Sequence, residues 1–384
     1  MIVEVVMKKI RKLSSSLLLI VGVSVTLCLS GTGHTSNETS GVFQQTAYYD
    51  NYPIQVIDIH FHPSNGWESV GPLGKEFILK ELPSWLPGPL KTLGVKVASS
   101  LINSPYGAFG IKKECQAAGI SFCGLFATYA PDTWGIVSNQ FIIEALEDDR
   151  NPNNTLGKKL FFGLASIDIN DWETTKGEKL KNLEESLRNN LIKGIKMAHI
   201  HNNVPLDRKG FEGIYELANQ YKVPVYHHVG STPLRKLEDF GSNTEKSDYI
   251  RSYDPVMLED LIEKYPNIPF ILGHMGFDFN AEGYDFTDDA IALAQAYPNV
   301  FLEISAMGRP IFDETGLVLD HAFNRIKSKN LINKVIYGSD GPVYPGATKA
   351  YLNSVMNSMS RMDYNYDEAQ KVLFHNANMI FKVY

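Results

Sequence analysis

Short apolar runs alternate with longer amphipathic segments along the chain after residue 53. The apolar runs, which read as strands, are Gln55–His62, Ser121–Tyr129, Leu160–Asp168, Leu191–His199, Val223–Gly230, Pro269–Gly276, Val300–Met307 and Lys334–Gly338. Several segments between them begin with Asp or Pro, as helix N-termini do: Asp171–Asn190, Asp207–Tyr221, Pro255–Tyr265, Asp288–Tyr297 and Phe312–Lys329. Eight strands that alternate with helices predict an α/β fold, a parallel (β/α)8 TIM barrel.

The connection after the first strand, about residues 64–120, is much longer than the others. Its proline and glycine content, at Pro83, Pro87, Gly88 and Pro89, predicts a small insertion over the mouth of the barrel. We consider two roles for the insertion, a functional lid and a surface excursion without function. The sequence does not decide between them. Trp67 and Trp134 lie in loops at this end, where they would wall a substrate pocket or pack the insertion.

Polar residues gather at the C-terminal ends of the predicted strands, where the active site of such a barrel lies. The first strand ends in Asp58-Ile-His-Phe-His62, and residues two apart on a strand point the same way. His60 and His62 can therefore bind one metal ion, with Asp58 on the same face one pleat deeper. The later strand ends contribute Lys196, His227, His228, His274 and Asp340.

In combination, these motifs resemble those of the amidohydrolase superfamily. The closest resemblance is to the amidohydrolase-related branch, which includes aminocarboxymuconate-semialdehyde decarboxylase and related metal-dependent hydrolases. The motifs are His-x-His on strand one, Pro-Val-x-x-His-x-Gly on strand five, Gly-His-Met-Gly on strand six and Gly-Ser-Asp-Gly-Pro on strand eight. A terminal Asn376-Ala-Asn378 extends the resemblance over nearly the whole chain that follows Asp58.

The resemblance implies a metal site with His60, His62, His228 and Asp340 as ligands. Three imidazoles and a carboxylate suit one Zn²⁺ ion and leave room for a water, whose pKa the metal would lower to about 7. His274 then stands beside that water as general acid or base, and Asp340 both ligates and accepts a proton. Parity counted from the His-x-Gly ending of the family motif selects His228 as the ligand, so His227 points toward the helix layer.

Lys196 and Arg309 each have two possible roles. In binuclear members of the superfamily the strand-four lysine is carbamylated and bridges two metals; here Lys196 is that bridge or a polar anchor, and the branch favours one metal. Arg309 would bind a substrate carboxylate or form a surface ion pair, and Arg235 is a weaker candidate of the same kind. His199 and His201 follow strand four and reach toward the rim.

The N-terminus predicts export. Lys8, Lys9, Arg11 and Lys12 precede an apolar run from Leu17 to Leu29, so residues 1–30 are predicted to be a signal peptide. Cys28 is a candidate for lipidation. Residues 31–52 form a predicted flexible leader, and residues 53–384 the catalytic domain. We expect a bacterial protein that is periplasmic, secreted or lipid-anchored, and that contacts the membrane only through the signal or anchor.

Composition narrows the partners. The net charge of −7 and the lack of a basic patch argue against nucleic acid, which leaves a small-molecule substrate; a homodimer is left open. Cys115 and Cys123 follow the predicted signal, the second in an apolar strand where burial is expected, and one disulfide between them is left open.

The leading hypothesis is a metal-dependent hydrolase that acts on a small ester, lactone or amide. The first alternative is a non-oxidative decarboxylase, a lyase of a carboxylated cyclic substrate, at the same site. A remote alternative is a non-catalytic binding protein, which would be favoured only if the ligand set were broken.

Overall fold

The computed structural model describes residues 45–384 except 65, 82–86, 108 and 314. The predicted signal peptide and Cys28 lie outside these residues. Within the described part, none of the helices has the length and apolarity needed to cross a membrane.

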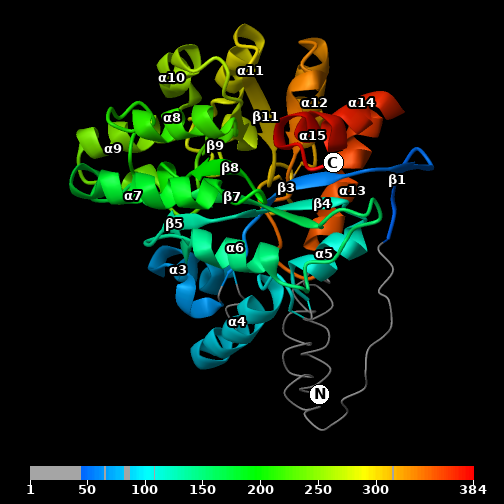
Figure 1. Cartoon of the computed structure of the whole chain (residues 1–384), viewed down its shortest axis with the longest axis horizontal. Coiled ribbons are helices and arrows are strands. Elements are labelled where there is room, and N and C mark those ends of the chain that lie inside the picture. Colours follow the sequence, from blue (N-terminus) through cyan, green and yellow to red (C-terminus); the bar gives the residue numbers. More distant parts are fainter. Residues whose placement is uncertain (1–44, 65, 82–86, 108, 314) are drawn as a thin grey trace.

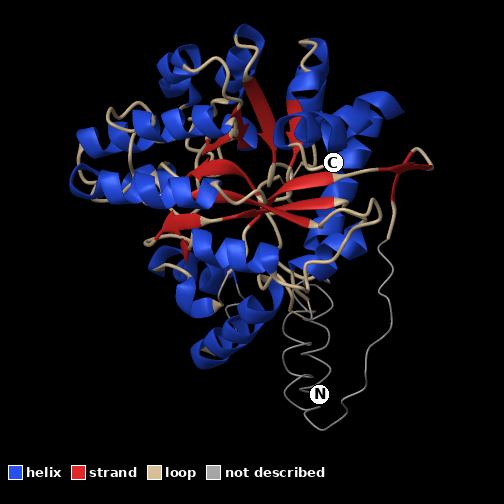
Figure 2. Ribbon diagram, viewed as in Figure 1, coloured by secondary structure: helices blue, strands red, loops and turns tan. Residues whose placement is uncertain are grey.

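Eight parallel strands form one sheet that closes into a barrel, with helices around it (Figure 2). In chain order the strands are β3 (Ile57–Phe61), β4 (Phe122–Phe126), β7 (Phe161–Ser166), β8 (Ile192–Met197), β9 (Val225–His228), β10 (Phe270–Gly273), β11 (Val300–Ile304) and β12 (Val335–Tyr337). Each lies inside one of the eight predicted runs. The (β/α)8 barrel is therefore confirmed, because strands buried on both faces read as continuous apolar runs.

The helices lie outside the sheet in the expected alternation (Figure 1). They are α3 (Pro72–Glu81), α4 (Gly88–Ile102), α5 (Ile111–Ala118), α6 (Asn139–Glu147), α7 (Trp172–Leu187), α8 (Glu212–Tyr221), α9 (Asn243–Arg251), α10 (Glu259–Lys264), α11 (Thr287–Ala296), α12 (Val318–Ser328), α13 (Ala347–Arg361), α14 (Tyr366–Gln370) and α15 (Asn376–Phe381). Helices α3 and α4 belong to the predicted insertion, whereas α5 leads directly into β4.

The seam between the first and last strands is held by a few specific contacts. The backbone N–H of His62 donates to the carbonyl oxygen of Gly341 at 3.0 Å, and the N–H of Gly341 donates to the carbonyl oxygen of His60 at 3.3 Å. The Asp58 carboxylate accepts from the backbone N–H of Ser339 at 2.9 Å. Residues at the C-terminal ends of the first and last strands thus close the barrel.

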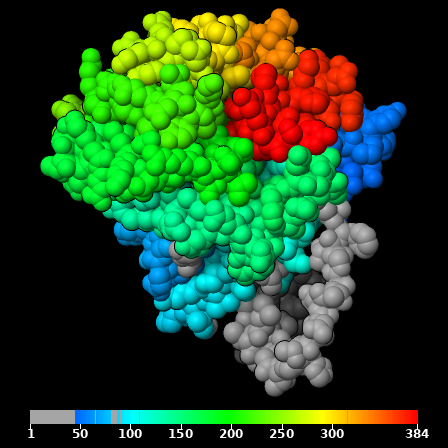
Figure 3. All heavy atoms as spheres, in the orientation of Figure 1, coloured from blue at the N-terminus to red at the C-terminus, as the bar shows by residue number. Residues whose placement is uncertain are grey.

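The end of the barrel opposite the site is filled by aromatic side chains and the C-terminal helix. Phe122, Phe162 and Phe301 point into the barrel and cluster with Phe374 and Phe381. The ring of Phe381 lies 5.4 Å from that of Phe162. Figure 3 shows the C-terminal surface (red) seated against the middle of the chain (green). Among the described residues, the polar side chains that could carry chemistry therefore lie at the C-terminal ends of the strands.

Two small hairpins were not predicted from the sequence. The first pairs β1 (Ala47–Tyr49) with β2 (Tyr52–Ile54), and the Tyr49 hydroxyl donates to the carbonyl oxygen of Tyr364 at 2.7 Å. The described end of the predicted leader is therefore packed on the barrel, and the ordered domain begins before residue 53. The second pairs β5 (Thr128–Ala130) with β6 (Gly135–Val137) in the loop after β4.

The insertion and the two cysteines make local contacts. Trp134 packs edge-on against Phe77 of α3, with ring centroids 6.3 Å apart, and Trp67 is buried. These tryptophans pack the insertion, which decides between the two roles considered for them. Cys115 on α5 and Cys123 on β4 form a disulfide, and both are fully buried.

Candidate metal centre

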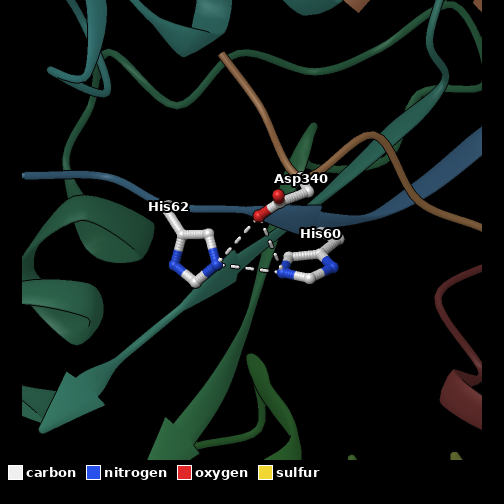
Figure 4. A group of neighbouring side chains, drawn as sticks. All are labelled: His60, His62 and Asp340. Atoms are coloured by element: carbon white, nitrogen blue, oxygen red, sulfur yellow. Dashed lines mark hydrogen bonds and ion pairs between the residues drawn. The ribbon is translucent and has the colours of Figure 1, made fainter. Parts of the chain in front are cut away.

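Three electron-rich atoms converge at the C-terminal end of β3. The Nε2 atoms of His60 and His62 lie 2.9 Å apart, and one carboxylate oxygen of Asp340 lies 3.3 Å from each of them (Figure 4). The strand brings the two imidazoles to one side because they are two residues apart. Asp340 arrives from the loop after β12, across the barrel seam.

The backbone is unusual at two residues of this region. Asp340 has φ of 56° and His274 has φ of 60°, both in the left-handed region that non-glycine residues seldom adopt. Strain of this kind is retained where surrounding contacts enforce it, and it clusters at functional sites.

Glu303, which the sequence interpretation missed, lies directly behind His60. Its Oε1 is 3.1 Å from His60 Nδ1, and its Oε2 accepts hydrogen bonds from Ser305 Oγ at 2.7 Å and from the Tyr226 hydroxyl at 3.2 Å. If Nδ1–H of His60 donates to Glu303, the Nε2 lone pair faces the convergence point. Carboxylates orient metal-binding histidines in this way.

Two motif glycines make room for this hidden layer. A Cβ on Gly338 would lie 1.9 Å from Glu303 Oε1, and a Cβ on Gly273 would lie 1.9 Å from the Tyr226 hydroxyl. A side chain at either position would displace Glu303 or Tyr226. A carboxylate inside the apolar run Val300-Phe-Leu-Glu-Ile304 was the signal that could have identified Glu303.

The site favours neutral imidazoles and an ionised aspartate. Burial holds the pKa of His60 well below its usual range and lowers the pKa of His62. Burial alone would raise the pKa of Asp340, but His60, His62 and Arg309 outweigh it and hold that pKa well below the ordinary range. Metal ligation requires these protonation states.

Arg309 supports the loop that carries Asp340. Its Nη2 donates to the carbonyl oxygens of Ser339 and Asp340, both at 2.6 Å, and its Nη1 lies 3.7 Å from Asp340 Oδ2. These contacts differ from the surface ion pair considered for Arg309, and its contact with a substrate carboxylate stays a prediction. The guanidinium is committed to the metal-site loop.

His228 and His274 form a second pair beside the three converging atoms. Their ring centroids are 4.3 Å apart, and the His274 ring is 5.4 Å from that of His60. His274 Nδ1 lies 3.1 Å from the Ser305 carbonyl oxygen. Among the described residues, the group whose ligand atoms all lie within 4.8 Å of one another contains His60, His62 and Asp340 and leaves His228 outside.

Lys196 reaches the site from β8. Its Nζ lies 3.2 Å from His62 Nε2 and 4.7 Å from the centroid of the Phe126 ring. Burial lowers the pKa of this lysine to about 7. An amine with such a pKa exchanges readily between charged and neutral forms, which keeps both the anchor and the bridging role open.

His227 and Asp58 occupy the places that strand parity predicts. The His227 ring lies 5.9 Å from the rings of both Phe270 and Tyr215 in one aromatic cluster, on the helix side of β9. Asp58 Oδ1 accepts from the backbone N–H of His60 at 3.1 Å and from Ser339 across the seam. Burial raises the pKa of Asp58 to about 7.

The residues present fit a divalent cation. The two imidazole nitrogens, 2.9 Å apart, and the carboxylate oxygen lie close enough together to ligate one cation. Imidazole and carboxylate donors suit Zn²⁺ and other first-row metals. The hydrogen bonds of His60 with Glu303 and of Asp340 with Arg309 add the outer support that such a site needs.

Comparison with known proteins shows what the sequence is similar to. Residues 173–383 match the family model described as amidohydrolase, a stretch that contains Lys196, His228, His274 and Asp340. Protein fluG of Emericella nidulans is 24% identical over 143 residues. The match covers 34% of this chain and 15% of that protein, so the chain corresponds to a small part of this relative.

Solved structures share the barrel at low sequence identity. An uncharacterized TIM-barrel protein from Bordetella bronchiseptica matches with a TM-score of 0.54 and 15% identity over 86% of this chain and 99% of its own. A probable 2-pyrone-4,6-dicarboxylic acid hydrolase from Acinetobacter baumannii matches with a TM-score of 0.53 and 15% identity, over 85% and 99%. The 5-carboxyvanillate decarboxylase LigW from Sphingomonas paucimobilis gives 0.51 and 14%, over 86% and 100%.

Proposed function

The chain belongs to the amidohydrolase family, and on that premise we propose that it is a metal-dependent hydrolase of a small ester, lactone or amide. The observation that carries the proposal is the convergence of His60, His62 and Asp340 on one point, with 2.9 and 3.3 Å between their donor atoms. Two imidazoles and an ionised carboxylate are a donor set that suits a first-row divalent metal.

We assign His60, His62 and Asp340 to one metal ion, with Zn²⁺ as the expected metal and His228 as the fourth protein ligand. When bound, such a metal polarises a carbonyl group and lowers the pKa of water. Glu303 fixes the ring of His60, and Arg309 fixes the loop of Asp340. Both keep the donor atoms in place before the substrate arrives.

His274 is the proposed general base and acid. With its Nδ1–H donated to the Ser305 carbonyl oxygen at 3.1 Å, its Nε2 is free to accept a proton. Burial lowers the pKa of His274, so the neutral, proton-accepting form predominates at neutral pH. Asp340 is the second proposed proton acceptor of the cycle, and Arg309 beside its second oxygen keeps it ionised until then.

A non-oxidative decarboxylase is the second candidate. Lys196 favours it, because a buried amine 3.2 Å from a metal-site imidazole could hold a carboxylate against the metal. The structural neighbours named above include both a hydrolase and a decarboxylase, which at their low identity supports the shared barrel and leaves the reaction to experiment.

The test combines metal analysis with substitution. We expect the purified protein to contain about one zinc per chain, and His228→Ala and Asp340→Ala to lose most of it. His321→Ala, at an exposed histidine on α12, is the matched control and should keep its metal. Full metal content in both site variants would overturn the assignment. A panel of esters, lactones and aromatic carboxylates, assayed for acid and for carbon dioxide, separates the two reactions.

Export is proposed on the basis of the N-terminal sequence, and the Cys115–Cys123 disulfide supports it, because disulfides persist in oxidising compartments. Fractionation of a bacterial host that expresses the full chain should place the protein outside the cytoplasm. Cys28→Ser should release it from the membrane fraction if Cys28 is lipidated, and should change nothing otherwise.

A further inference from the structure

A row of imidazole rings leads away from the converging atoms to His201, a residue that the proposed mechanism does not use. From His60 the row passes to His274 at 5.4 Å, to His228 at 4.3 Å and to His201 at 4.9 Å between ring centroids. His201 lies in the turn after β8 and is 3% exposed. The row ends inside the barrel mouth.

His201 carries a polar atom with no hydrogen-bond partner. Among the described side chains, its Nδ1 is buried without a partner, and so is Nε of Arg235. Buried nitrogen atoms of this kind are nearly always satisfied by protein, water or ligand. His201 and Arg235 adjoin each other, so a bound anion could accept from both of these nitrogens.

Arg235 adjoins His201 from the loop after β9. Its Nη2 lies 3.5 Å from the carbonyl oxygen of His201, and its side chain is 15% exposed. Among the described residues it pairs with the carboxylate of Asp132, which is 71% exposed and lies 3.5 Å away. This weak pair leaves most of the guanidinium charge without compensation, which is costly for a largely buried cation.

We propose that His201 and Arg235 form an anion subsite that selects substrates with a negatively charged oxygen group at the end remote from the reacting bond. Arg235 Nε–H and His201 Nδ1–H would donate to that group, of which a carboxylate is the simplest example. The inference rests on the proposed function, since it places the reacting bond at the converging atoms. His201 and Arg235 act as specificity-determining residues and take no part in bond cleavage.

The test uses two esters that differ in charge alone, monomethyl succinate and dimethyl succinate. Calorimetry on the zinc-loaded protein measures binding, and release of methanol measures turnover. We expect the monoanion to bind at least about tenfold more tightly than the neutral diester, as the loss of a hydrogen bond to a charged group predicts. Inorganic phosphate, as a second probe, shows whether the subsite accepts other anionic oxygens.

The variants are Arg235→Met, which keeps the apolar stem, and His201→Phe, which keeps the ring. Both should abolish the preference for the monoanion while zinc content and binding of the diester stay unchanged. Arg208→Met, at an exposed arginine paired with Glu173 at 3.5 Å, is the control and should keep the preference. If a variant loses zinc or fails to fold, the test of the anion subsite rests on two other measurements. These are the preference for the monoanion in Arg235→Lys and in the unaltered protein.

The outcomes separate the two proposals. Equal binding of both esters by the unaltered protein, or a preference that survives in Arg235→Met and His201→Phe, would overturn the anion subsite. Charge-selective binding that these variants abolish, without any turnover of either ester, would uphold the subsite and count against ester hydrolysis.

Discussion

Oε1 of Glu303 lies 3.1 Å from Nδ1 of His60, and both side chains are completely shielded from solvent. Burial raises the pKa of Glu303, and its hydrogen bonds with Ser305, Tyr226 and the backbone N–H of His274 compensate its charge. One carboxylate thereby fixes a proposed metal ligand and the backbone of the proposed general base.

Replacement of Glu303 should weaken metal binding without touching a ligand. We expect Glu303→Gln to lower zinc affinity by about 10–100-fold, because the amide accepts a weaker hydrogen bond from His60. Competition with a chelator measures the change. Glu114→Gln removes another buried carboxylate, one that accepts from the backbone N–H of Gly346, and should leave the affinity unchanged. An equal loss in both variants would point to general destabilisation.

His227 and His228 are neighbours in sequence with opposite expected sensitivities. His227→Phe should preserve zinc content and activity, since the new ring can keep the stacking with Phe270 and Tyr215. His228→Phe should abolish activity. Zinc analysis and turnover of the best ester of the panel check both. Inactivity of His227→Phe with a normal melting temperature would contradict the placement of its side chain outside the site.

The disulfide should stabilise the fold to a modest degree. Cys115 and Cys123 are eight residues apart, and closing so short a loop is worth about 2–3 kcal/mol in the chain-entropy description. Cys115→Ser should lower the free energy of urea unfolding by about that amount. Intact mass under non-reducing conditions checks that the bond is present. Equal stability of the variant and the oxidised parent would contradict the expectation.

Asp320 on α12 should make stability depend on acid pH. It accepts from Nε and Nη2 of Arg361 on α13 at 2.8 and 2.6 Å, and these bonds lower its pKa. Since the pKa is lower in the folded state, the stabilisation is complete above the unfolded pKa of about 3.9 and disappears as the pH falls through the lower folded value.

Asp320→Asn should therefore cost about 1 kcal/mol at pH 7, a low value because Arg361 is half exposed. The gap between variant and parent should begin to narrow below about pH 4 and should close only below the lower pKa that Asp320 has in the folded state. Urea unfolding at pH 7, 4 and 2 tests both statements. Glu185→Gln, which loses only an exposed pair with Lys181 at 3.9 Å, should show no gap at any pH. A gap for Asp320→Asn that keeps its full size at pH 2 would contradict the electrostatic origin.

The sequence predicted the barrel and the converging residues well, for physical reasons. Buried parallel strands are continuous apolar runs, and His60 and His62 are positioned by the alternation of one strand. Glu303 was not predicted as a site residue because its partner, His60, lies 243 residues away in the sequence. The contacts of Arg309 with the loop of Asp340 and the unpartnered nitrogen of His201 depend on the conformation of loops. Loop conformation leaves no periodic pattern in the sequence. The β1–β2 hairpin lies in a polar stretch that carries no apolar pattern.

The seam between β3 and β12 joins architecture to chemistry. His60 and His62 sit on one side of it, Asp340 on the other, and backbone bonds between His62, His60 and Gly341 cross it. Loops after the remaining strands can therefore be exchanged at little risk to the closure of the barrel. A change at either edge of the seam, however, alters both the closure of the barrel and the proposed metal ligands. In a circular permutant with new termini beside residue 341, we would expect a barrel that opens first at its own reaction centre.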